Sequence, residues 1–535
     1  MKDINWLFKR IKLIRCFANS GIVCNFAAFM KKGIGKYYNL VLSVLVGIGI
    51  FLFWYVAYPH ALSYQEQYQL FLWTGDYFLE RISLPGGFAD WLGEFIVQFY
   101  YVEWLGALLL ALLFVALQRL TLRLLTHGDS PHVLFRTQGT VPMCLSLLPV
   151  ALVLWLMGDI NVLLSLPVAI VLALALACFR LPKRLSWMDI LIVPVAYWLL
   201  GPVVWIYIVV RVLQIGWQHL WSAGWLVAVQ LMVYAWLLPQ WPLQQAMTGL
   251  SYYRIPLQYP QWSGYDKDMY ELIRLDYLVR NERWDEIVKR AGEYQVKTAF
   301  WSECVNLALA EKRLLADRMF DFYQSGADAL IMPRTRDLTS MLPSAEAFWH
   351  LGMVNSAQRY MFDTQESILN AKKSGRCTKR IAECMIVNGH YQTARKQLDL
   401  LKKSLFYRSW AEEAEAMMKV ETKINLHPVY GKLRQLRYKE NFLYNYDEID
   451  KMFGLLFMNN QENKMALDYF MAQMLLKGNL QGFQQYMGAV QQFGGYRQMP
   501  LGYQDVMRCI QMQGRVPDSP YAKYVERMSR REAER

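Results

Sequence analysis

The apolar block between Tyr38 and Trp241 constrains this 535-residue chain more than any other feature, because its hydrophobic runs are long enough to cross a bilayer. A hydrocarbon core about 30 Å thick takes about 20 apolar residues of α-helix. Runs that come near that length lie at 40–58, 104–124, 141–157, 162–179, 187–212 and 223–238. We therefore predict a polytopic transmembrane helix bundle over residues 38–241, preceded by a basic leader at 1–37.

The number of spans depends on the run Trp187–Val212, which is interrupted by Pro194 and by Gly201-Pro202. This run is either one kinked span or two short helices that meet at the Gly-Pro break. One kinked span gives six crossings and places both ends of the chain on the same side. Two helices give seven crossings and place the C-terminal half opposite the N-terminus. We favour two helices and an external C-terminal half.

Charge predicts the orientation of the early spans. The leader carries eight Lys/Arg and one Asp, an excess typical of cytoplasmic segments. The loop at 61–103 carries six acids and one base, Arg81, and is expected on the external side. Met30-Lys-Lys, directly before the first span, is a second plausible translation start, which leaves open whether residues 1–29 are expressed.

The external loop at 61–103 has the most distinctive local sequence. We predict a helix over Tyr64–Ile82, a turn at Leu84-Pro85-Gly86-Gly87, and a second, aromatic-rich helix over Phe88–Tyr101. Aromatic side chains of this kind settle at the headgroup level of a membrane. The two helices either brace the bundle at its surface, or carry acids that face a membrane-level cavity and act on a substrate there.

Residues 266–535, which follow a linker at 242–265, show helical patterning with recurring small and large positions. The spacing of tetratricopeptide repeats recurs in four segments: 275–291, 345–361, 381–398 and 467–487. One helix pair cannot bury its own apolar face, so neighbouring pairs stack into a solenoid with a concave groove. We predict an all-α chain whose α-solenoid domain binds a protein, a peptide or another part of its own chain.

Several other functions are not expected from the sequence. The eight cysteines include no CxxC pair, the seven histidines are scattered, and no nucleotide-binding or hydrolase motif is present, so we expect no metal and no cofactor. The spans contain essentially no ionisable residues, which argues against an ion-coupled transporter. The net charge of +13 is not gathered with aromatic residues on one face, so nucleic acid is not an expected partner. The expected partners are the lipid bilayer and a protein or peptide.

Two segments carry a family resemblance: Phe78-Leu-Glu-Arg-Ile-Ser-Leu-Pro-Gly-Gly and Leu275-Asp-Tyr-Leu-Val-Arg-Asn-Glu-Arg-Trp. They resemble an uncharacterised family of multi-pass membrane proteins of Bacteroidetes-type bacteria, classed under a domain of unknown function. The resemblance covers most of the chain from about residue 38. It implies a location in the bacterial inner membrane and assigns no catalytic residue.

A weaker resemblance is to the C-type membrane glycosyltransferases, which use lipid-linked sugar donors and carry a catalytic acid on juxtamembrane helices of their first external loop. It implies a general base acting on an acceptor hydroxyl, with Glu66, Asp76, Asp90 and Glu94 as candidates. The chain lacks the acidic pair found at the start of that loop and has few spans for the class. We therefore expect a membrane-anchored scaffold of the cell envelope without catalysis, with such an enzyme as the alternative.

Overall fold

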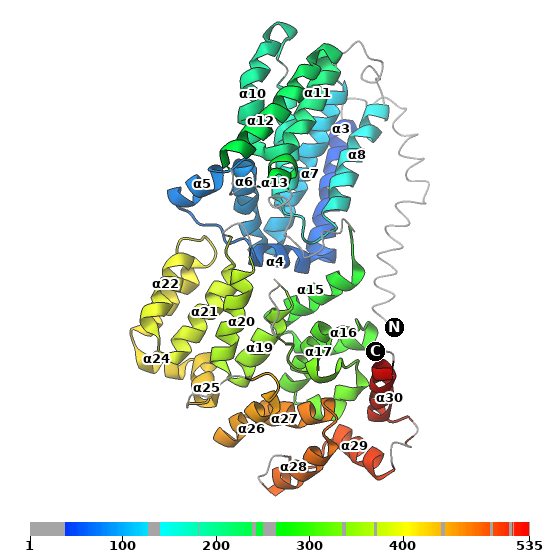
Figure 1. Cartoon of the computed structure of the whole chain (residues 1–535), viewed down its shortest axis with the longest axis vertical. Coiled ribbons are helices and arrows are strands. Elements are labelled where there is room, and N and C mark those ends of the chain that lie inside the picture. The colour runs from blue at the N-terminus through cyan, green and yellow to red at the C-terminus, as the bar shows by residue number, and fades with distance from the viewer. Residues whose placement is uncertain are drawn as a thin grey trace.

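The computed structural model describes residues 38–126, 140–179, 181–237, 242–249, 264–333, 339–368, 372–439, 445–492, 496–512, 516 and 518–533. These residues form helices and contain no strand, as the all-α class predicts. An N-terminal bundle stacks end to end on a C-terminal helical domain along the long axis of the molecule (Figure 1). The predicted basic leader at 1–37 lies outside the described residues.

Three helical segments are long and apolar enough to cross a membrane: Tyr38–Ala57, Glu103–Thr126 and Arg184–Ile215. The first comprises α3 (Tyr38–Leu52) and a π-helical turn, and the second is α7 (Glu103–Thr126). α7 lies inside the bundle, because it packs against α3, α8 and α9. The shorter apolar helices are α8 (Thr140–Leu156), α9 (Ser165–Cys178) and α12 (Trp221–Leu237). Every predicted apolar run therefore contains a helix.

The segment Arg184–Ile215 reverses direction at Gly201-Pro202. Asp189 and Arg211 would be about 33 Å apart on one straight helix, yet Arg211 Nη2 lies 3.1 Å from Asp189 Oδ2. The segment is therefore a hairpin of α10 (Asp189–Leu200) and α11 (Trp205–Ile215). Gly201 adopts φ 70° and ψ −158°, a conformation essentially restricted to glycine. Of the two alternatives, the structure shows two helices that meet at the Gly-Pro break.

The end of this hairpin opposite to the turn buries charged side chains. Asp189 accepts hydrogen bonds from Arg211 and Tyr207 and lies 2.8 Å from His219 Nε2. Asp189, Arg211 and His219 are all buried. The expectation of spans essentially free of ionisable residues is therefore wrong at this end of the bundle, because these groups neutralise one another across three helical elements.

The loop between the first two long spans is built differently from the sequence prediction. It contains α4 (Pro59–Gln67), α5 (Gly75–Ile82), α6 (Gly87–Val97) and a 3₁₀ turn at Gln98–Tyr101. The single helix predicted over Tyr64–Ile82 is wrong, because residues 68–74 are not helical. In this stretch the Leu70 N–H donates to Lys373 O and the Trp73 N–H to Lys403 O, both at 2.8 Å.

The predicted turn and second helix of the loop are confirmed. Gly86 has φ 82° and Gly87 begins α6. A Cβ on Gly87 would lie 1.8 Å from Arg81 O, so no larger residue fits this turn without a shift of the backbone. α6 then packs against α9 and α10, which places the loop on the end of the bundle.

The C-terminal domain consists of consecutive helices packed in pairs. The four predicted repeat copies fall on the pairs α15/α16 (Lys267–Arg280, Trp284–Glu293), α19/α20 (Met341–Leu351, Val354–Glu366), α21/α22 (Gly375–Asn388, Tyr391–Leu401) and α27/α28 (Lys464–Leu476, Leu480–Gln492). The almost fully buried α17 (Ala299–Glu311) packs against α15, α19 and α27 and forms the centre of the domain.

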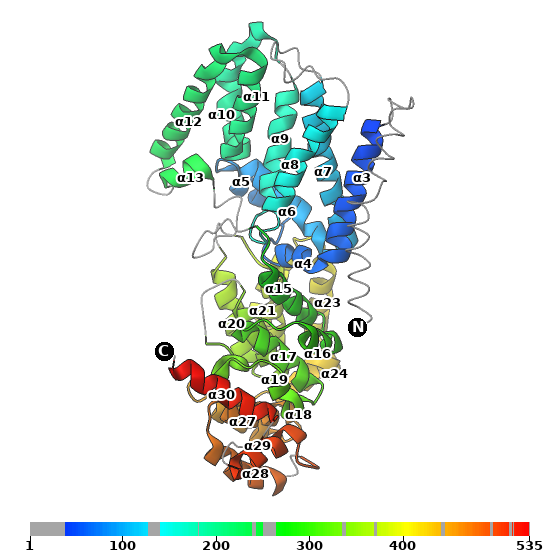
Figure 2. The ribbon, with the colours of Figure 1, turned by 90° about the vertical axis from the view of Figure 1, so that its right-hand side faces the viewer.

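The remaining helices continue the array towards the C-terminus. They are α18 (Leu315–Arg318), α23 (Arg408–Met418), α24 (Glu421–Leu426), α25 (Pro428–Leu436), α26 (Ile449–Asn459), α29 (Leu501–Gln511) and α30 (Pro520–Ala533). The predicted linker contains the short helix α13 (Leu243–Thr248), which packs against α12. α4 packs against both α15 and α21, so the loop lies between the bundle and the C-terminal domain (Figure 2).

We expect Gly201→Ala to lower the free energy of unfolding by about 1–3 kcal/mol, the usual cost of forcing a side chain into such a backbone conformation. Gly224→Ala is the matched control, because Gly224 lies inside α12 and a Cβ there would meet no atom within 4 Å. Thermal unfolding in detergent measures both variants. Equal melting temperatures for wild type and Gly201→Ala would contradict the strained hairpin turn.

Candidate functional site

A cavity of about 370 Å³ lies where the loop meets the C-terminal domain. The bundle side contributes Ser63 and Glu66 of α4, Tyr100 and Tyr101 of the 3₁₀ turn, and Glu103 of α7. The opposite wall is formed by Tyr277, Arg280, Asn281, Glu346, Arg376, Lys379, Arg380, Glu383 and Tyr407. Four of the lining side chains are carboxylates and four are cations, so this is a polar cavity with balanced charge.

Arg376 connects the two walls of the cavity. Its Nη1 donates to Asp276 Oδ2 at 2.7 Å and to Gln67 Oε1 at 2.9 Å, and its Nη2 donates to Glu346 Oε1 at 3.0 Å. Arg380 donates to the other oxygen of Glu346 at 2.7 Å. Burial acts to raise the pKa of Glu346, but Arg380 and Arg376 lower it to about 2. Glu346 is therefore ionised and holds Arg376 and Arg380 of α21 in place.

A second charged cluster fastens α6 to the C-terminal domain. Lys372 Nζ lies 2.7 Å from Asp90 Oδ1 and 2.8 Å from Glu94 Oε1, and Arg81 Nε lies 3.1 Å from Glu94 Oε2. All four side chains are buried. Burial raises the pKa of Asp90 against the attraction of Lys372, whereas Lys372 and Arg81 together overcome burial and lower the pKa of Glu94.

The four acids proposed from the sequence as catalytic candidates lie in three different environments. Glu66 lines the cavity, where it accepts a hydrogen bond from Tyr407 Oη at 2.7 Å and lies 3.5 Å from Arg280. Asp90 and Glu94 belong to the buried cluster with Lys372. Asp76 is exposed in the first turn of α5. The structure therefore places only Glu66 of the four at the cavity.

The sequence analysis missed the basic residues of the site. Lys372 reaches Asp90 across 282 positions of sequence, a pairing that no local pattern reveals. A signal was present in α21, where Arg376, Lys379 and Arg380 recur at the i, i+3 and i+4 spacing of one helix face. Three cations on one face of a repeat helix indicate a charged surface there, although Arg376 and Arg380 pair with acids of the C-terminal domain itself.

Aromatic residues gather at this junction, beside helices that are long and apolar enough to cross a membrane. Tyr101 stacks on Phe406 with ring centroids 5.2 Å apart, which brings the turn before α23 against the loop. Trp104, in the first turn of α7, is exposed, as is Trp73 on the loop. Exposed tryptophans next to an apolar span are typical of the membrane interface. The cavity therefore lies where the apolar helix α7 begins.

We expect Lys372→Met to lower the free energy of unfolding by about 3–5 kcal/mol, because two buried carboxylates lose the cation they share. The matched control is Lys419→Met, since Lys419 is exposed and forms no ion pair in the described part of the chain, and it should change stability by less than about 0.5 kcal/mol. Thermal unfolding and limited proteolysis report the effect. Unchanged melting of Lys372→Met would show that the cluster does not fasten the loop to the domain.

Comparison with known proteins tests the family resemblance seen in the sequence. The chain matches no curated protein and no protein of solved structure. Residues 36–533 match the profile of a family of unknown function, DUF6057, so the match includes both the bundle and the C-terminal domain. The predicted resemblance to a family classed under a domain of unknown function is thus confirmed, and the chain belongs to the DUF6057 family.

Proposed function

We propose that the protein is a scaffold of the bacterial cell envelope, of the Bacteroidetes type, anchored in the inner membrane by a multi-pass bundle. In this proposal a tetratricopeptide-like domain is held on the external face and binds a protein or peptide partner. The observation that carries the proposal is the contact of Lys372 with both Asp90 and Glu94 in a buried site. Charges buried between two parts of a chain keep the domain in one orientation above the membrane, as a scaffold requires.

The helical hairpin supports an external C-terminal domain. In this proposal α10 and α11, each preceded by a 3₁₀ turn, are separate short passes, and the bundle crosses the membrane seven times, by α3, α7, α8, α9, α10, α11 and α12. An odd number of crossings places the C-terminal domain opposite the basic leader, which charge predicts to be cytoplasmic. The contacts between α4, α15 and α21 also require the domain to lie on the same side as the loop at 58–103.

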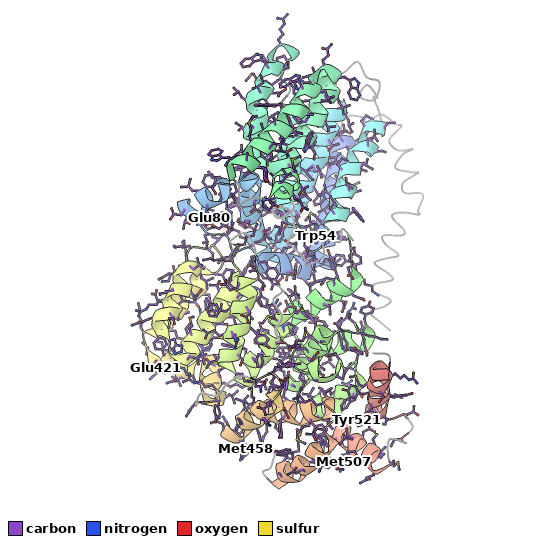
Figure 3. The ribbon with its side chains drawn as sticks, in the orientation of Figure 1. Trp54, Glu80, Glu421, Met458, Met507 and Tyr521 are labelled. Atoms are coloured by element: carbon purple, nitrogen blue, oxygen red, sulfur yellow. The ribbon has the colours of Figure 1, made fainter. Side chains whose placement is uncertain are left out.

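We expect Glu80→Cys and Lys419→Cys to react with a membrane-impermeant maleimide from the periplasm, in a background with Cys16, Cys24 and Cys144 replaced by serine. Glu80 is exposed on α5 at the edge of the molecule (Figure 3), and Lys419 is exposed after α23. Arg184→Cys, at the other end of the bundle, should react only after lysis of the inner membrane. Labelling of Glu80→Cys and Lys419→Cys from opposite sides would contradict the architecture, and labelling of both from the cytoplasm would reverse the orientation.

In this proposal the loop occupies part of the face that a repeat array offers to partners. α4 packs against α15 and α21, so this part of the chain acts as an internal ligand of the domain. The cavity between them keeps charged side chains within reach of a ligand. In this proposal the cavity is the ligand-binding site of the scaffold.

The alternative is a C-type glycosyltransferase-like enzyme, and one observation favours it: Glu66 lines a polar cavity next to a membrane-crossing helix. Asp90 and Glu94 are unsuited to catalysis because their carboxylates are engaged by Lys372 and Arg81. Asp76 is exposed and is not among the residues that line the cavity. An enzyme of this kind would therefore use Glu66 as its general base.

We expect Glu66→Gln to complement a deletion strain under envelope stress as well as wild type does, because glutamine still accepts the hydrogen bond from Tyr407. An enzyme that used Glu66 as general base would lose about 10²–10⁴ in rate. Asp76→Ala is the control, because both hypotheses predict that it complements as well as wild type does. Loss of complementation by Glu66→Gln at wild-type expression and melting temperature would favour the enzyme if Lys379→Ala, another change in the lining of the cavity, still complements. Loss in both variants would instead indicate damage to the ligand-binding site of the scaffold.

A further inference from the structure

Within the described residues, pairing the charges that line the cavity leaves one cation and one carboxylate without an oppositely charged partner. Glu346 is neutralised by Arg376 and Arg380, and Arg380 also pairs with Glu383 at 2.8 Å. Glu66 is approached by Arg280. The two charged groups that remain are Lys379 of α21 and Glu103 of α7.

Lys379 is a half-buried cation with free hydrogen-bonding capacity. Its Nζ lies 4.9 Å from the ring centroid of Trp410, and in the described part of the chain its N–H groups donate no hydrogen bond besides this cation–π contact. It forms no ion pair within the described residues. Arg376 Nε, buried and without a hydrogen-bond partner in the same part of the chain, is a further donor among the cavity-lining residues.

Glu103 is the complementary acceptor on the bundle side. It accepts a hydrogen bond from the Tyr277 hydroxyl, and burial together with this bond raises the pKa of Tyr277 to about 12, so the donor is neutral. The described residues provide no cation within salt-bridge distance of Glu103. Lys379 and Glu103 thus come from opposite sides of one cavity, and each lacks a counter-ion.

The volume and the charge balance limit what can bind. A cavity of about 370 Å³ is within the range of small-molecule sites. Because four carboxylates and four cations line it, a polyanion or a polycation would meet as much repulsion as attraction. A ligand with one charge of each sign satisfies both unmatched groups at once.

We propose that the cavity binds a small zwitterion, whose oxyanion contacts Lys379 and whose primary amine contacts Glu103. This inference rests on the proposal that the cavity is the ligand-binding site of the scaffold. Two sources offer this chemistry: a soluble amino acid or short peptide, and the phosphoethanolamine headgroup of a membrane lipid. The second is within reach because Glu103 is the first residue of a membrane-crossing helix.

Isothermal titration of the full-length protein in detergent tests the proposal with dialanine and glycerophosphoethanolamine, whose phosphodiester carries a single negative charge. Ethanolamine and inorganic phosphate serve as half-ligands. We expect the zwitterions to bind at least tenfold more tightly than either half-ligand, and Lys379→Ala and Glu103→Gln each to weaken their binding at least tenfold. The matched controls are Lys419→Ala and Glu412→Gln, exposed residues that do not line the cavity, and both should bind as wild type does.

Nanodiscs distinguish the two sources of the ligand. If the lipid headgroup occupies the cavity, phosphatidylethanolamine discs should weaken binding of glycerophosphoethanolamine at least tenfold relative to phosphatidylglycerol discs. Equal affinity in the two discs assigns the site to a soluble zwitterion.

Three results would overturn the zwitterion proposal: half-ligands that bind as tightly as zwitterions, zwitterion affinities unchanged in both variants, or no binding by either zwitterion. The scaffold itself is judged separately, by complementation and by labelling. If complementation and labelling agree with the scaffold but neither zwitterion binds, the proposed function is retained and the zwitterion proposal is rejected.

Discussion

The arrangement of this protein depends on one lysine placed between two carboxylates. Asp90 and Glu94 lie one turn apart on α6, where two like charges destabilise a helix, and burial adds to that cost. Lys372 from the C-terminal domain contacts both, and Arg81 from α5 contacts the second. Since either side alone would leave buried charge without a partner, the loop and the domain are stable in this form only together. These ion pairs therefore help to hold the domain against the loop.

The helices were predictable because the information that specifies them is local. The apolar run at 104–124 became α7, and the pattern at 381–398 became α21 and α22, with Gly389 in the left-handed conformation at the end of α21. The break in the predicted helix at Tyr64–Ile82 was not predictable from its own sequence. Its hydrogen bonds go to the carbonyls of Lys373 and Lys403, so its structure is decided by residues about 300 positions away.

For the same reason, the acidic residues of the candidate site could be predicted from the sequence and its basic residues could not. Acids concentrated in one short loop are visible in a sequence, whereas the cations that meet them are spread over a repeat domain. Asp76 and Glu94 were equivalent candidates by type and position, yet one is exposed and the other is buried against Lys372 and Arg81. They differ because Glu94 lies on a helix face that contacts the C-terminal domain and Asp76 does not. That difference depends on how the two parts of the chain pack and not on the local sequence.

The basic face of α21 also explains how one interface can hold its walls in place and still bind a ligand. Arg376 and Arg380 are neutralised by acids at salt-bridge distance, whereas Lys379, on the same face between them, faces an aromatic ring and no acid. An interface that only held two parts together would gain stability by closing over this position, since an unmatched half-buried charge is costly. The chain instead keeps a cavity there, with a second unmatched charge, Glu103, among the residues that line it. The fastening pairs fix the walls, and the two unmatched charges are left for a ligand.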